Sequence, residues 1–293
     1  MGFVSLHPAI TFGWFICAIL LTVMVANPLW MACAFVGAAA YYLSVRGRSG
    51  WNVVLGLIPV FVALSLANGL FNPRGSTVLF TYFDRPYTLE AVLYGSQTAG
   101  MFVTVMLLFG SYNRVMTADR FTYLFGGVIP ALTLVLTMVL RLVPSYMRKA
   151  KQIAGARDCI GKGAAEGGFG GRACHGADVL GALTTWALEA GVVTADSMRS
   201  RGYGASPRRT QYACYRFGLR DGLVLAVAIV FACLALAGIL QGASGVEYLP
   251  QVELPSVTPF GILSLLAFAA FLFIPSTIDL RERISWRNSI SRI

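Results

Sequence analysis

The chain has 293 residues, 57% hydrophobic and only 12% charged, with a mean hydropathy of +0.69 and a formal net charge of +10. This composition, with several apolar runs near bilayer-spanning length, excludes an ordinary soluble protein and indicates a polytopic membrane protein. The positive charge is typical of cytoplasmic loops of membrane proteins, so we expect the lipid bilayer as a partner and no nucleic acid.

Four apolar runs in the first part of the chain predict membrane-spanning helices at residues 10–26, 29–45, 53–70 and 91–110. Asn27-Pro28 forms a tight turn between the first two, and a polar stretch at residues 72–90 separates the third from the fourth. Residues 121–140 are apolar but contain glycines and a proline. That segment predicts either a further span or a short re-entrant or interfacial piece that leads into a helix.

The polar middle of the chain predicts two long helices. The first covers residues 131–156, and the glycine-rich segment 161–176 is expected to be a flexible connector. The second covers residues 178–201, with Asp178 as its N-terminal cap and glycines at positions 202 and 204 that are suited to end it. Two further apolar runs, at residues 222–240 and 259–274, predict a fifth and a sixth span before a basic tail.

The distribution of basic residues predicts the orientation. Between positions 141 and 220 there are thirteen Arg or Lys against five Asp or Glu, so this segment should be cytoplasmic, together with both termini. The fold class predicted is therefore all-α: about six transmembrane helices with long cytoplasmic helices between them. We divide the chain into N-terminal transmembrane helices at 1–130, a coupling-helix region at 131–221, and C-terminal transmembrane helices with the tail at 222–293.

Patterns for enzymatic chemistry are weak. The glycine-rich segment lacks the spacing of a phosphate-binding loop, and Cys174-His175 has no second pair of ligands at zinc spacing. The six cysteines form no CxxC pair, which favours free thiols, and no basic segment precedes the first apolar run, so we expect no cleavable signal peptide. Charged residues within the predicted spans are nearly absent, which argues against a self-sufficient transporter and favours a scaffold that works through partners.

Two arginines near predicted helix ends are the positive signal. Arg157 lies between Ala156 and Asp158, and Arg201 lies between Ser200 and Gly202. An arginine at such a place presents a planar fork of donors that suits carboxylates or backbone carbonyls on another protein. The residues alone leave open a second interpretation, in which both arginines cap helix carbonyls or face lipid headgroups.

Several segments carry a resemblance to the CbiQ-like transmembrane T components of energy-coupling factor (ECF) transporters. They are LHPAITF at 6–12, Asn27-Pro28, RLVPSY at 141–146, SMRSRGYG at 197–204, RRT at 208–210, Arg220-Asp221, and the tail at 275–286. Two positions depart from the family pattern: Thr11 stands where a basic residue is usual, and Asp158 stands where the first arginine motif commonly has glycine.

The resemblance implies a non-catalytic coupling subunit in the plasma membrane of a prokaryote. It implies two ABC-type ATPase partners that hydrolyse ATP, no cofactor or metal on this chain, and a membrane-embedded S component that captures a vitamin or transition-metal ion. Carried over by position, the ATPase contacts are Ala156, Arg157, Asp158, Ser200, Arg201 and Gly202. We expect Leu183, Trp186 and Val193 to face the S component. The alternatives are an autonomous membrane transporter or channel that needs no ATPase, and a membrane-bound enzyme or assembly factor.

Overall fold

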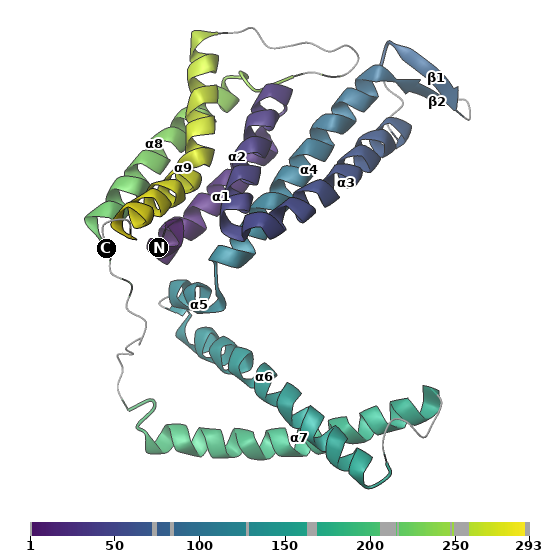
Figure 1. Cartoon of the computed structure of the whole chain (residues 1–293), viewed down its shortest axis with the longest axis vertical. Helices are drawn as coiled ribbons and strands as arrows, with labels where there is room; N and C mark the ends of the chain where they lie inside the picture. The colour runs from purple at the N-terminus through teal and green to yellow at the C-terminus, as the bar shows by residue number, and fades with distance from the viewer. Residues whose placement is uncertain are drawn as a thin grey trace. The chain divides into compact units, whose positions relative to one another are not determined.

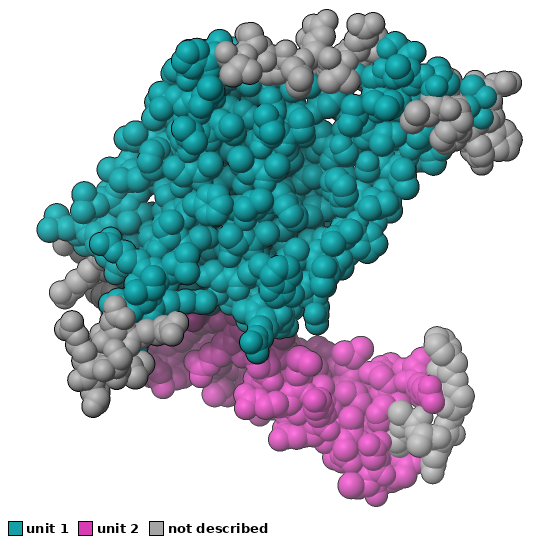
Figure 2. Space-filling view, turned by 45° about the horizontal axis from the view of Figure 1, so that its top comes forward, with its two compact units in different colours: residues 1–117, 215–293 teal, residues 118–214 magenta. Residues whose placement is uncertain are grey.

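A computed structural model describes residues 2–71, 75–82, 85–126, 129–162, 169–205, 215, 217–246, 248 and 258–290. The chain divides into two compact units, residues 1–117 with 215–293 (unit 1) and residues 118–214 (unit 2), which Figure 2 colours separately. The predicted division of the chain into three parts, 1–130, 131–221 and 222–293, stays a prediction.

Unit 1 is a helical bundle (Figure 1). Its helices are α1 (Pro8–Met24), α2 (Pro28–Arg46), α3 (Gly50–Phe71), α4 (Leu89–Val115), α8 (Leu219–Leu240) and α9 (Pro259–Ile290), with 3-10 turns at η1 (Phe3–Ser5) and η2 (Gly47–Ser49). Among the described residues, four stretches are long and apolar enough to cross a membrane: Pro28–Phe71, which contains α2 and α3, Leu89–Val115, Leu219–Leu240 and Pro259–Trp286. A helix lies at each of the six predicted spans, and the all-α, polytopic membrane fold is confirmed.

The first helices begin where the sequence supplies a cap followed by proline. The Nδ1 atom of His7 accepts the N–H of Ala9 at 3.3 Å, and the Oδ1 atom of Asn27 accepts the N–H of Leu29 at 2.9 Å. Proline takes the first position of both helices, where its missing N–H costs nothing. These two pairs therefore set the starts of α1 and α2 locally.

An aromatic cluster joins four elements of unit 1. The ring of Phe3 in η1 lies 5.5 Å from that of Trp14 and 5.8 Å from that of Tyr41, and Trp14 stacks on Phe271 of α9 at 5.6 Å. The indole N–H of Trp14 donates to the carbonyl of Phe271 at 3.1 Å. Pro275, four residues further on, has no N–H to offer that carbonyl, so Trp14 satisfies a group that the proline leaves free.

Small residues let neighbouring helices of unit 1 approach closely. A Cβ atom added to Gly95 of α4 would lie 2.5 Å from the carbonyl oxygen of Ser65 in α3. One added to Gly238 of α8 would lie 2.2 Å from the hydroxyl oxygen of Ser264 in α9. Such contacts are typical of membrane helices, which associate by close packing because lipid offers no hydrophobic driving force between them.

The polar stretch before α4 contains a β-hairpin that the sequence analysis missed. Strands β1 (Val78–Tyr82) and β2 (Arg85–Thr88) pair antiparallel, with Tyr82 opposite Arg85. The carboxylate of Glu90 accepts the N–H of Thr77 at 3.1 Å and the hydroxyl of Ser76 at 3.0 Å. The run VLFTY, rich in β-branched and aromatic residues, was the available signal for a strand.

Unit 2 contains α5 (Ala118–Gly126), α6 (Pro130–Cys159) and α7 (Phe169–Ser200), and α6 and α7 cross (Figure 1). The segment 121–140 is divided between α5 and α6, and neither helix is among the candidate spans, which agrees with the interfacial alternative. The expected flexible connector at 161–176 is partly wrong, because α7 already begins at Phe169. Residues 163–168 of that connector lie outside the described residues.

Candidate functional site: two arginines near helix ends

α7 ends in a glycine cap whose two backbone hydrogen bonds are both formed. Gly202 has a φ of 73°, its N–H donates to the carbonyl of Arg199 at 2.9 Å, and the N–H of Tyr203 donates to the carbonyl of Met198 at 3.0 Å. This pair of bonds is the Schellman motif, in which a left-handed residue satisfies the last carbonyls of the helix. Arg201 is the residue immediately before that glycine and is exposed, as is Ser200. The backbone therefore fixes the direction in which the Arg201 side chain leaves the helix.

The end of α6 has the same motif but places its arginine differently. Gly161 has a φ of 72°, its N–H donates to the carbonyl of Asp158 at 3.1 Å, and the N–H of Lys162 donates to the carbonyl of Arg157 at 3.0 Å. Ile160, not Arg157, therefore precedes the left-handed glycine. Arg157 lies in the last turn of α6 and Arg201 directly follows α7, so both arginines lie at helix C-termini, as predicted. Their positions relative to the capping glycine differ: Arg157 lies four residues before Gly161, whereas Arg201 lies one residue before Gly202.

Arg157 pairs with an acid on the neighbouring helix. Its Nη2 atom lies 2.5 Å from the Oδ2 atom of Asp178 in α7, and the side chains are 24% and 58% exposed. The Nε atom of Arg157 is buried and has no hydrogen-bond partner among the described residues. Asp178 lies inside α7, so its predicted role as an N-terminal cap is wrong. Arg157 reaches this acid rather than its neighbour Asp158, which is exposed.

The sequence is similar to those of curated membrane proteins named energy-coupling factor transporter transmembrane protein EcfT. The protein of Bacillus selenitireducens is 30% identical over 111 residues, which are 38% of this chain and 41% of the relative. The protein of Staphylococcus aureus is 24% identical over a region that covers 64% of this chain and 76% of that protein. The protein of Lactobacillus helveticus is 28% identical over a region that covers 66% of this chain and 73% of that protein. The chain resembles the ECF T components. No protein-family model matches it.

The comparisons thus confirm the predicted resemblance to T components. The chain spans less than half of the length of the Bacillus selenitireducens protein.

In this T-component-like chain, Trp186 faces the other long helix: its ring lies 5.6 Å from that of Tyr146, and the Nζ atom of Lys149 lies 5.6 Å from the centroid of the Trp186 ring. Leu183 is half-buried, and Val193 is 63% exposed. Trp186 therefore contributes to the crossing of α6 and α7.

A separate apolar surface of α7 is open. Leu180, Leu188 and Val192 are 63%, 70% and 63% exposed and lie eight and four residues apart, which places them on one side of the helix. We call these three residues the α7 apolar face. The hydrophobic periodicity does not single out these three residues, because apolar residues occur on both sides of α7. The contacts of Trp186 and Asp178 with α6 show which other side chains of α7 already have partners.

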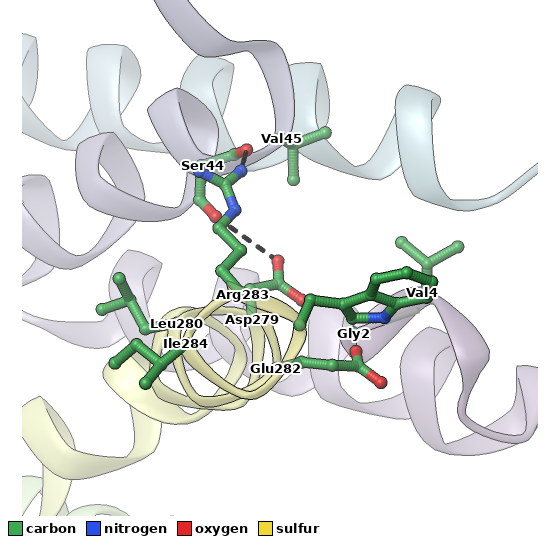
Figure 3. A pocket seen from close by; sticks show the side chains of 10 residues that line it. Gly2, Val4, Ser44, Val45, Asp279, Leu280, Glu282, Arg283 and Ile284 are labelled. Atoms are coloured by element: carbon green, nitrogen blue, oxygen red, sulfur yellow. Dashed lines mark hydrogen bonds between the residues drawn. The ribbon is translucent and has the colours of Figure 1, made fainter. Parts of the chain in front are cut away.

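Unit 1 of this T-component-like chain contains a groove of about 770 Å³, shown in Figure 3. The carboxylate of Asp279 on α9 accepts the N–H of Phe3 at 2.7 Å and the hydroxyl of Ser44 at 3.5 Å, and Arg283 donates to the carbonyl of Ser44. These bonds attach α9 to η1 and α2. The polar groups are thus engaged in holding the bundle together, and the rest of the lining is mainly apolar.

Proposed function

We propose that the chain is the transmembrane coupling subunit of an ECF-type transporter. It would join two cytoplasmic ABC-type ATPases to a membrane-embedded S component that captures a vitamin or transition-metal ion. The similarity to three EcfT proteins and the apolar helices of unit 1 support this assignment. The subunit itself is non-catalytic and binds no cofactor, because its partners hydrolyse the ATP. It lies in the plasma membrane of a prokaryote, with both termini and unit 2 in the cytoplasm.

The observation that carries the proposal is the exposed Arg201 on a fixed helix end. Two backbone hydrogen bonds and a left-handed glycine hold the last turn of α7, so little backbone conformational entropy is lost when a partner binds the side chain. A guanidinium presents its donors in a planar fork that matches carboxylates and pairs of carbonyls. A groove on an ATPase that offers such oxygens would bind the end of α7.

The same geometry supports a mechanism of rigid-body transmission. ATP binding closes the ATPase pair and moves the grooves that hold the arginines. α7 is one continuous helix from Phe169 to Ser200, so motion of its end passes along it as a rigid body. α6 runs from Pro130 to Cys159 with Pro144 inside it, so the part of α6 after Pro144 moves rigidly with Arg157. Helices that shift in this way would move any partner packed on their sides.

The S component would then contact unit 2 through exposed apolar residues. Val193 and the α7 apolar face are suitable, since an exposed apolar surface marks a site of interaction with protein or lipid. Leu183 and Trp186, for which the same contact is predicted, lie nearer the crossing with α6, and their role toward the S component stays a prediction. Sliding of this surface would tip the S component and release its cargo inward.

Purification of the tagged full chain from native membranes in mild detergent, followed by mass spectrometry, tests the proposal. The wild type should carry two ABC-type ATPase chains and an S component. Arg201→Ala should lose the ATPases, and Arg201→Lys should lose most of them, because lysine keeps the charge but not the bidentate geometry. Arg199→Ala, an exposed arginine in the same last turn, is the matched control and should keep them.

Equal ATPase recovery from all four proteins would remove Arg201 from the interface. Recovery of the chain alone, under conditions that preserve other membrane complexes, would contradict the coupling function and favour an autonomous transporter.

A further inference from the structure

We infer that Asp178 is the positioning residue of Arg157: it orients the first arginine for the ATPase from the neighbouring helix α7. The inference deepens the proposed function and rests on it, because its readout is binding of the ATPases. It starts from a difference between the two arginines: Arg201 directly precedes its capping glycine, whereas Arg157 lies four residues before Gly161 and pairs with Asp178 on α7.

The ion pair is too weak to serve mainly as a structural staple. Asp178 is 58% exposed and Arg157 is 24% exposed, and a pair open to water to this extent shifts an equilibrium by about 5-fold at most. The crossing has other contacts, since Trp186 packs against Tyr146 and Lys149. The principal effect of Asp178 is therefore on the orientation of the guanidinium, which would otherwise sample many rotamers.

The orientation leaves the guanidinium incompletely paired. Asp178 takes the Nη2 end, while the buried Nε donor of Arg157 has no partner among the described residues. The chain itself encloses Nε, but the side chain is 24% exposed, so part of it remains open to a further acceptor. A carboxylate or carbonyl oxygen of the partner ATPase would bind the guanidinium from this open side, beside Asp178.

The pair also gives α7 a second point of attachment. Asp178 and Arg201 are 23 residues apart on one helix, which corresponds to about 35 Å along its axis. One ATPase would act on the far end of α7 directly through Arg201. The other would act on α6 through Arg157, where α6 contacts α7 at Asp178, nine residues after the first residue of α7. The two ATPases would then act at two separate places along α7.

The test measures the affinity of the purified ATPase pair for the full chain in nanodiscs. We expect Asp178→Asn to weaken binding about 3- to 5-fold and Asp178→Glu, which keeps the carboxylate, to recover part of the loss. Arg157→Ala should weaken binding by about 10-fold or more, because a charged hydrogen bond is lost. Asp196→Asn, the same change at an exposed acid of α7, is the matched control and should bind like the wild type.

The charge swap Arg157→Asp with Asp178→Arg distinguishes two roles of Asp178: orienting Arg157, and holding α6 and α7 together. Spin labels at Gln152 and Ala182, both exposed, report the spacing of α6 and α7 by double electron–electron resonance in a cysteine-free background. The single variants and the swap should all keep the wild-type spacing, and the swap should not recover the affinity, since the arginine now projects from the wrong helix.

Full recovery of affinity in the swapped protein would reduce Asp178 to a staple and overturn the inference. So would wild-type binding by Asp178→Asn when Arg157→Ala binds weakly, and in that case the proposed function would stand. If neither Arg157→Ala nor Arg201→Ala changes the affinity, the proposed function itself fails.

Discussion

Replacement of Gly202 by alanine tests whether the backbone at the end of α7 sets the direction of Arg201. Gly202 has a φ of 73°, and a Cβ atom added there would meet nothing within 4 Å. The cost is therefore backbone strain alone, about 1–2 kcal/mol for an L-residue in the left-handed region. That strain favours a frayed last turn by about 5- to 30-fold, because about 1.4 kcal/mol is a factor of 10. ATPase recovery should fall by a similar factor.

The assay is ATPase recovery with the tagged chain, together with its melting temperature in detergent. Gly202→Asn should recover much of the binding, since asparagine tolerates the left-handed conformation. Gly191→Ala is the control: it lies within α7, has equally open surroundings, and favours the helix. If Gly202→Ala and Gly191→Ala bind the ATPases equally well, the cap does not position Arg201 and the reasoning is refuted.

Three further predictions concern other parts of the chain. Trp14→Phe leaves a buried carbonyl of α9 unsatisfied and should lower the free energy of unfolding by about 1–3 kcal/mol, seen as a lower melting temperature in detergent. Asp158→Gly should end α6 about a turn earlier and separate Arg157 from Asp178. In that background Asp178→Asn should no longer lower the affinity for the ATPases, and a loss as large as in the wild-type background would contradict this. Leu188→Arg, at a 70% exposed site, should remove the S component from the purified complex while the ATPases stay bound; loss of neither would refute the α7 apolar face.

The sequence was most informative where the cause of the structure is local. Hydrophobic runs, the His7-Pro8 and Asn27-Pro28 starts, and the glycine at 202 depend on a few neighbouring residues, and the structure follows them. The hairpin at Val78–Thr88 was missed because much of its anchoring comes from other elements: the carboxylate of Glu90 and the carbonyl of Leu66, which accepts the Tyr87 hydroxyl at 3.3 Å. Neither partner is part of a strand pattern.

The candidate site was predicted by residue but not by geometry. Identifying Arg157 required only a motif, whereas its place within α6 depends on where that helix ends. α6 continues through Asp158 to Cys159, and the left-handed Gly161 caps it. The partner of Arg157 could not be predicted, because Asp178 is brought to it by the crossing of two helices that are separated by glycine-rich sequence.

Photo-cross-linking from Tyr203 in intact cells tests the central claim most directly. This residue is 43% exposed and lies two positions after Arg201, so a photoreactive phenylalanine there replaces one exposed aromatic ring by another. We expect the labelled protein to capture an ABC-type ATPase. The labelled protein that also carries Arg201→Ala should not form this cross-link. Capture of lipid or of this chain alone, with the labelled protein present at its normal level in the membrane, would contradict the account.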